Sequence, residues 1–164
     1  MDQHLIWAFH YQIKHQCHYA DLALKAIGED QFWFGVQSLL TCAANISKML
    51  WGQGGKLSKE RAPLRITLGV GDNSPLRPTT MRNHYEHIDE RLDEWWRDSK
   101  RRNFADENIG PAPVIAGIDD IDSFRAFDPR SGLLQFWGDT FDLRAVVNEI
   151  GRIHSAVDLV MKRG

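Results

Sequence analysis

The 164-residue sequence has few cysteines, little net charge and no long apolar run. Its two cysteines, Cys17 and Cys42, cannot form a disulfide framework, so we expect a reducing compartment, the cytoplasm. No stretch approaches the roughly 18 consecutive apolar residues that span a bilayer. The first residues also lack the basic start and apolar run of a signal peptide. We therefore expect no membrane partner.

The chain also has no large excess of charge of either sign. It contains 20 Lys and Arg and 22 Asp and Glu, so the formal net charge is −2. No global field would attract nucleic acid, so any such binding must rest on a local patch. Apolar residues make up 43% of the chain and charged residues 26%, which is typical of soluble globular proteins. The length predicts one domain over residues 1–164 with a core of its own.

Apolar residues recur at spacings of three and four along much of the chain, which predicts amphipathic helices. The first four predicted helices span residues 3–27, 31–51, about 58–70, and about 80–100. We expect Asp30 to cap the second helix, and Thr79 or Thr80 to cap the fourth. The second helix is apolar nearly all round, which indicates a central, buried position.

The pattern changes after residue 108, where prolines appear and the helical period stops. Residues 123–141 read as two short strands joined by a turn at "DPRSG". A final helix is expected from Asp142 to the end, because apolar residues again recur at helical spacing. The predicted fold is therefore mainly α: a bundle of four to five helices with one β-hairpin before the C-terminal helix.

The stretch "RNHYEH", residues 82–87, lies at the start of the fourth predicted helix. With Tyr85 on the core side, Asn83 and His87 fall one turn apart on the outer face, close enough to share a hydrogen bond. Arg82 lies at one edge of that face and His84 at the other. Free backbone N–H groups of the first turns favour an anion there.

An Arg-Asn pair four residues before a His, within a small helical bundle, resembles the signature of the HEPN superfamily. Arg82, Asn83 and His87 match its fixed positions. The resemblance implies an all-α homodimer, in many members a metal-independent endoribonuclease of a toxin or defence system. It implies RNA and an antitoxin or regulatory protein as partners, no cofactor, and two facing motifs. The hairpin departs from the minimal bundle, and Asp89 replaces the modifiable tyrosine of one toxin subgroup.

These residue types suit RNA cleavage without a metal. Histidine titrates near neutrality, so His87 is the expected acid or base, and Arg82 can bind phosphate oxygens through its planar fork. Asn83 would orient His87 or hydrogen-bond the phosphate. Further substrate contacts are expected from His84 and from the basic pair Lys100 and Arg101.

Several features leave other interpretations open. Five carboxylates share the helix of the motif and would repel a phosphate backbone: Glu86, Asp89, Glu90, Asp93 and Glu94. The alternative function is a non-catalytic, HEPN-like binding or regulatory module whose same face docks a protein or nucleotide. The histidines show no established metal-ligand spacing, so no metal site is expected. Trp95 and Trp96 could stack bases, although packing into the core is the commoner role.

Overall fold

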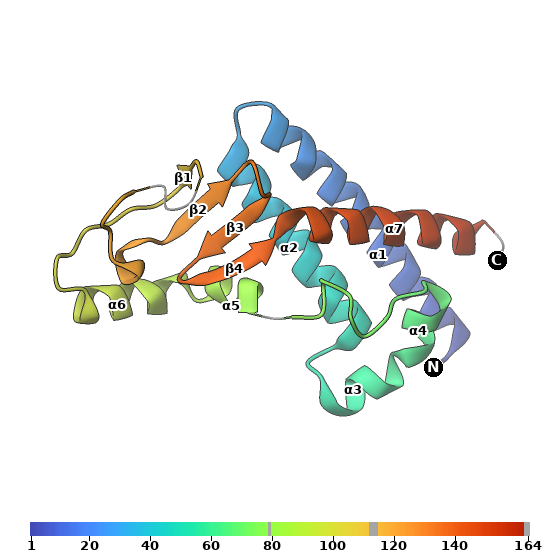
Figure 1. Ribbon diagram of the computed structural model, residues 1–164. Coiled ribbons are helices and arrows are strands. Elements are labelled where there is room, and N and C mark those ends of the chain that lie inside the picture. The colour runs from blue at the N-terminus through green and yellow to red at the C-terminus, as the bar shows by residue number, and fades with distance from the viewer. Residues whose placement is uncertain (79, 112–114, 163–164) are drawn as a thin grey trace. The chain divides into compact units, whose positions relative to one another are not determined.

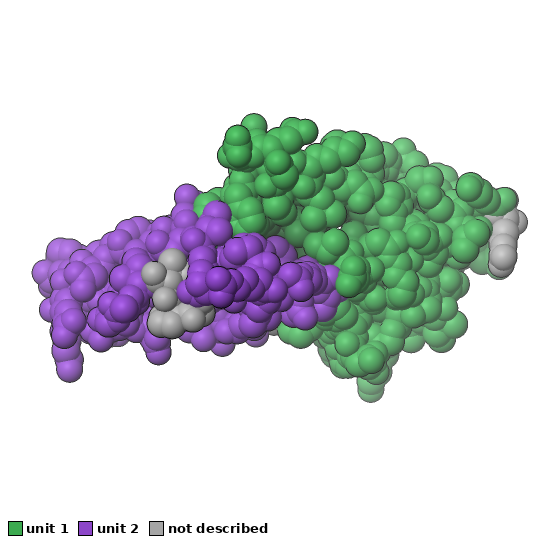
Figure 2. All heavy atoms as spheres, turned by 45° about the horizontal axis from the view of Figure 1, so that its top comes forward, with its two compact units in different colours: residues 1–79, 146–164 green, residues 80–145 purple. Residues whose placement is uncertain are grey.

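The computed structural model describes residues 1–78, 80–111 and 115–162, with the backbone alone at residues 81 and 82. Packing divides the chain into two compact units (Figure 2). Unit 1 comprises residues 1–79 and 146–164, and unit 2 comprises residues 80–145. The predicted mainly helical class is confirmed, and a small four-stranded sheet accompanies the helices (Figure 1). The single domain over residues 1–164 stays a prediction.

Two long helices that pack along each other form the base of unit 1. They are α1 (Gln3–Gly28) and α2 (Phe32–Trp51), each within one residue of its predicted ends. Asp2 caps α1, because its carboxylate accepts hydrogen bonds from the backbone N–H groups of His4 at 2.9 Å and Leu5 at 3.2 Å. The expected cap of α2 was wrong. Asp30 has a left-handed φ of 61°, and Gln31 occupies the N-cap position.

Gly35 allows α1 and α2 to approach closely. A Cβ atom at Gly35 would lie 2.5 Å from Ile27 Cγ1 and 2.7 Å from the backbone oxygen of Ala23. Both distances are far shorter than carbon atoms tolerate, so any side chain here would push the two helices apart. The crossing of the two longest elements of unit 1 therefore depends on this glycine.

Two short helices replace the single helix predicted over residues 58–70. They are α3 (Gly55–Glu60) and α4 (Ala62–Thr67). Pro63 lies in the first turn of α4, where its missing N–H is not needed, so it begins this helix instead of interrupting a longer one. The guanidinium of Arg65 donates to the backbone oxygen of Leu50 at 2.7 Å and thereby satisfies a carbonyl near the end of α2.

The last helix, α7 (Leu143–Met161), begins one residue after its predicted start and completes the core of unit 1. The thiol of Cys17 on α1 faces the backbone oxygen of Ile150 on α7 at 3.9 Å. Side chains of unit 1 with no exposed surface include Ile13, Cys17, Leu39, Ile46, Leu50, Leu64, Ile153 and Val157. Among the described helices, none combines the length and apolar character needed to cross a membrane.

A row of aromatic and imidazole rings follows the exposed side of α1. Its members are His4, Trp7, Tyr11, His15 and Tyr19. Trp7 is 51% exposed, and its ring stacks on that of Tyr11 at a centroid distance of 5.5 Å and an angle of 18°. The sequence interpretation missed this row, because an apolar-periodicity search follows the buried face of a helix and not its opposite side.

Unit 2 contains the sheet. Its strands are β1 (Asn108–Ile109), β2 (Arg125–Asp128), β3 (Leu133–Phe136) and β4 (Asp139–Asp142), in that spatial order. Strand β1 pairs parallel to β2, and the other pairs are antiparallel. The hairpin predicted at residues 123–141 corresponds to β2 and β3, but β1 and β4 were missed. Trp137 and Gly138 link β3 to β4 with φ of 52° and 79°, as a tight two-residue hairpin turn requires.

Aromatic side chains form the core of unit 2. Phe136 on β3 has no exposed surface, and Phe124, just before β2, is 1% exposed. The rings of Tyr85 and Trp95 contact this pair, Tyr85 on Phe136 at a centroid distance of 4.8 Å and Trp95 on Phe124 at 6.2 Å. Phe124 and Phe136 therefore pack in the core of unit 2.

Candidate functional site at the junction of two short helices

The predicted helix of residues 80–100 is divided at His87. The two parts are α5 (Thr80–Glu86) and α6 (Ile88–Asp98), and Thr79 lies outside the described residues. His87 has φ −122° and ψ 38°, which is not helical, yet its N–H still donates to the backbone oxygen of Asn83 at 3.0 Å. The N–H of Arg91 donates to the oxygen of His87 at 3.2 Å. The junction is therefore a kink across which helical hydrogen bonds continue.

The kink leaves the imidazole of His87 half exposed, at 49% of its side chain. Its Nδ1 lies 3.1 Å from Oε1 of Glu90, three residues later on α6. An ionised carboxylate can only accept, so the proton of this hydrogen bond belongs to Nδ1. In the neutral ring, Nε2 then carries the lone pair and can accept a proton.

The other two members of the expected motif lie on α5. Asn83 is half-buried, and the hydrogen bond that joins it to His87 is between backbone atoms, whereas the imidazole bonds to Glu90. The side chain of Arg82 lies outside the described residues, although its backbone is part of α5. The expected side-chain bond between Asn83 and His87 is thus replaced by the bond between His87 and Glu90.

His84 occupies a buried position, with 5% of its surface exposed. Its Nε2 lies 2.7 Å from Oδ2 of Asp139 on β4, and its ring contacts those of Phe136 at 5.3 Å and Phe141 at 6.2 Å. A ring enclosed in this way joins α5 to the sheet and has little surface left for a phosphate. The helical wheel placed His84 at the edge of the core face, but the inward face of α5 includes both His84 and Tyr85.

Tyr85 lies beside a network of charges that the sequence interpretation missed. The guanidinium of Arg125 donates two hydrogen bonds to Asp106, at 2.8 and 2.6 Å, and forms an ion pair with Glu107 at 3.0 Å. Burial raises the pKa of the Tyr85 hydroxyl to about 12, although the nearby Arg125 acts in the opposite direction. Hydrogen bonding to Asp106 raises the pKa of Arg125, so this cation keeps its charge. Short local motifs do not signal such a pair, because its partners are 19 residues apart.

Lys100 and Arg101 are exposed in the segment that follows α6. The helix ends two residues earlier than predicted, at Asp98, because Ser99 adopts an extended backbone and turns the chain. Both cations therefore lie on a loop, as solvent-facing groups that a phosphate could reach.

A buried carboxylate, Asp122, holds that loop. Asp122 has no exposed surface, and its Oδ1 accepts hydrogen bonds from the Ser99 hydroxyl at 2.5 Å and from the indole N–H of Trp95 at 3.0 Å. A buried polar group of this kind is stable only with such partners. No sequence pattern distinguishes Asp122 from its neighbours Asp119 and Asp120 before the chain folds.

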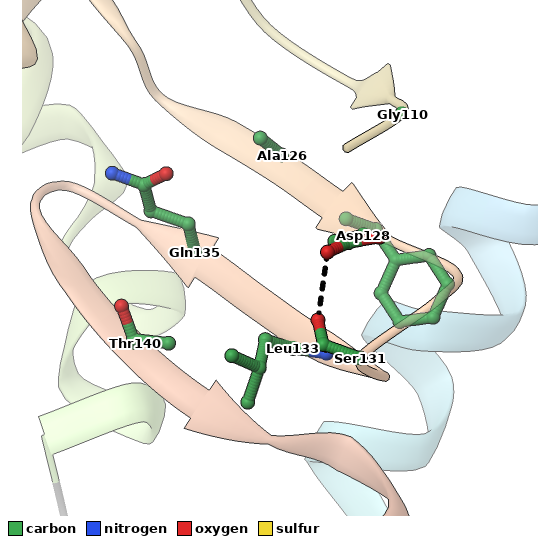
Figure 3. A pocket seen from close by; sticks show the side chains of 8 residues that line it. Gly110, Ala126, Asp128, Ser131, Leu133, Gln135 and Thr140 are labelled. Carbon is green, nitrogen blue, oxygen red and sulfur yellow. Dashed lines mark hydrogen bonds between the residues drawn. The ribbon is translucent and has the colours of Figure 1, made fainter. Parts of the chain in front are cut away.

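One face of the sheet is hollowed into a small pocket of about 120 Å³ (Figure 3). Ala126, Gln135 and Thr140 line its floor, and Asp128 at its rim is already bonded to the Ser131 hydroxyl at 2.9 Å. Sites for small organic ligands usually measure roughly 300–1,000 Å³. This hollow is too small for such a ligand, and its one charged group is engaged in the β2–β3 turn.

Among the described residues, no three His, Cys, Asp or Glu side chains gather where they could hold a metal ion. Compared with family models, curated proteins and solved structures, the chain matches none of them. The function must therefore be argued from the residues of the junction themselves.

Proposed function

We propose that this chain is a metal-independent endoribonuclease of a toxin or defence type, with a HEPN-like site at the α5–α6 junction of a homodimer. The observation that carries the proposal is the state of His87. Its ring is half exposed, and Glu90 fixes Nδ1 at 3.1 Å, which leaves Nε2 for proton transfer. A histidine oriented by a carboxylate and open to solvent on its other side is a common general base.

The reaction needs two proton transfers. Nε2 of one His87 takes the proton of the ribose 2′-hydroxyl as that oxygen attacks the adjacent phosphorus. The bond from phosphorus to the 5′-oxygen breaks, and this oxygen receives a proton from the His87 of a second copy. The products are a 2′,3′-cyclic phosphate and a 5′-hydroxyl. Arg82 would supply positive charge to the phosphorane, with Asn83 as its neighbour on α5.

The acidic residues of α6 are the main objection to an RNA site, but the hydrogen bond of Glu90 to His87 supports the proposal. Glu90 orients the imidazole of His87 and is thus a positioning residue. Glu94 forms an ion pair with Arg91 at 2.9 Å, which offsets a second charge. Asp89 and Glu90 also lie in the first turn of α6, where the helix dipole favours negative charge. The local repulsion is therefore smaller than the sequence suggested.

The same carboxylates favour a second candidate, a non-catalytic binding or regulatory module. Asp89, Glu90 and Asp93 are all exposed on α6. A row of exposed carboxylates could dock a basic segment of a partner protein, such as an antitoxin, without any reaction. In that case His87 would be a hydrogen-bonded surface residue only.

Cleavage of RNA in excess chelator separates the two candidates. We expect the wild-type protein to produce 2′,3′-cyclic phosphate ends, and His87→Ala to lose about 10²- to 10⁴-fold in rate, the usual contribution of a general acid or base. Arg82→Ala should show a comparable loss, and Glu90→Gln a smaller one. His18→Ala, at an exposed histidine of α1, is the matched control and should retain full activity.

Two results would contradict the ribonuclease. One is the absence of cleavage by the wild type on any RNA tested with the dimeric protein. The other is equal cleavage by the wild type, His87→Ala and Arg82→Ala, which would indicate a contaminating nuclease. Either result would favour the binding module.

A further inference from the structure

The segment that leaves α6 concentrates positive charge next to an exposed aromatic ring. Residues 97–102 contain four cations, Arg97, Lys100, Arg101 and Arg102, and one anion, Asp98. Arg97 is bonded to Asp98 at 3.0 and 3.1 Å, so three cations remain beyond that pair. The first half of α6 is acidic, so the two ends of this region carry opposite charge.

Within this segment, Arg102 stacks on Trp96. Its guanidinium carbon lies 3.8 Å from the centroid of the indole, and Trp96 is 57% exposed. A guanidinium in such a stack keeps its N–H donors at the edge, where they can reach phosphate oxygens. The pair therefore offers a flat guanidinium, backed by the indole, and a fixed positive charge at one place.

The stack is held by the buried carboxylate described above. Arg102 has a left-handed φ of 52°, which a residue with a side chain rarely adopts. Its N–H donates to the hydroxyl oxygen of Ser99 at 2.8 Å, and Ser99 in turn donates to Asp122. The backbone of Arg102 is thus fixed from inside unit 2, and binding there would lose little conformational entropy.

We infer that Trp96 and Arg102, with Lys100 and Arg101, form a binding subsite for single-stranded RNA. A base would stack on the outer face of the Arg102 guanidinium, whose inner face lies on Trp96, and the phosphates beside it would contact Lys100 and Arg101. A duplex would not suit this surface, because its bases are stacked on one another and hide their faces. The choice of RNA as the occupant rests on the proposed function, whereas the stacking surface and its charge do not.

The subsite lies at the far end of α6 from His87. The eleven residues Ile88–Asp98 span about 16 Å at the helical rise per residue. A strand that contacts both ends of one α6 must pass the acidic stretch of its first turns. RNA long enough to bridge this stretch should therefore bind more tightly than a dinucleotide, which can reach only one end.

Binding is measured with the full-length His87→Ala protein, which would hold RNA uncleaved, and with short fluorescent RNA by anisotropy. We expect single-stranded RNA to bind more tightly than the same sequence in a duplex. Trp96→Leu and Arg102→Gln should each weaken binding about tenfold, within the range of one lost stacking contact. Lys100→Gln should also lower the salt dependence, by about 0.7 in the log–log slope.

Matched controls lie elsewhere on the surface. Trp7→Leu removes a comparably exposed tryptophan from unit 1, and Arg130→Gln removes an exposed arginine from unit 2. Thermal unfolding of each variant checks that the fold is retained. Unchanged binding in Trp96→Leu and Arg102→Gln, equal losses in the two controls, or equal affinity for duplex and single strand would each overturn the subsite.

The two proposals fail separately. If the wild type cleaves RNA and the Trp96 and Arg102 variants bind and cleave as it does, the subsite is wrong and the ribonuclease stands. If no RNA is cleaved but the variants still lose binding to single strands, the ribonuclease is wrong and the subsite stands.

Discussion

The two units of this protein differ in the interactions that stabilise the interior of each. Unit 1 packs aliphatic side chains and a thiol between long helices, with Ile13, Leu39 and Ile153 fully buried. Unit 2 surrounds Phe136 with rings and ties its loops to buried polar groups, above all Asp122 and His84. The first arrangement depends on shape and area, and the second also depends on particular hydrogen bonds. We therefore expect unit 2 to respond more sharply to polar substitutions.

The largest effect should come from the centre of the aromatic core. Phe136→Ala removes a fully buried ring and should lower the free energy of unfolding by about 3–5 kcal/mol. Phe34→Ala, at a residue that is 65% exposed, is the control and should change it little. Hydrogen exchange should show the loss of protection at residues 80–145 first. Loss of protection of equal size in unit 1 would contradict the contrast between the units.

The next largest effect should come from Asp122, the buried carboxylate of unit 2. Asp122→Ala leaves the Ser99 hydroxyl without its acceptor. It also leaves the Trp95 indole N–H with only the backbone oxygen of Asn103, at 3.2 Å, so the substitution should cost about 1–3 kcal/mol. Both costs are read from the free energy of unfolding in urea titrations. Asp120→Ala, at an exposed carboxylate two residues earlier, should hardly change this free energy. If the two substitutions cost the same, Asp122 does not anchor the loop.

A smaller effect should appear in acid, in unit 1. Burial lowers the pKa of His10, whose Nε2 lies 2.9 Å from the Thr67 hydroxyl. The folded state thus prefers the neutral ring. The stability it contributes is present above about pH 6.5, the pKa of an unfolded histidine, and is lost as the pH falls. His10→Gln should flatten this acid loss in pH-dependent unfolding, whereas His18→Gln, at an exposed site, should leave it unchanged.

The smallest expected effect concerns the two cysteines, which should react only slowly with thiol reagents. Burial raises the pKa of the Cys17 thiol to about 12, and burial also raises that of Cys42. At pH 8 only about one Cys17 in 10⁴ would be a thiolate, so labelling by a thiol reagent should be slow until the protein unfolds. Both cysteines belong to unit 1, so labelling reports on this unit alone. Slow labelling in Phe136→Ala would show that damage to unit 2 does not open unit 1, and fast labelling would show that it does.

The same contrast explains which parts of the fold could be predicted. Helices α1, α2 and α7 were placed to within a residue or two at their starts because a helix that buries one face carries a local apolar period. Strand β1 is two residues long and pairs with β2 across a separation of 18 residues, Asn108 with Ala126, so no local pattern marks it. Strand β4 was merged into the predicted hairpin.

The candidate site was predictable only in part. The residue types and their spacing pointed to His87, and the structure leaves its ring half exposed. The kink at His87 could not be foreseen, since neither proline nor glycine is present there. The bond between His84 and Asp139 could not be foreseen either, because it joins residues 55 positions apart and depends on the fold of the sheet. No sequence motif marks Asp122, whose role in holding the loop after α6 depends on its burial in the folded protein.

The left-handed backbone of Arg102 sets stability and binding against each other. A left-handed conformation costs a residue with a side chain about 1 kcal/mol, and glycine adopts it freely. Arg102→Gly should therefore relieve strain in the folded state, even as it removes the charge over Trp96. Selection for stability alone would not retain an arginine at this turn. A variant library ranked by thermal tolerance should enrich glycine at position 102, while one ranked by RNA capture should remove it.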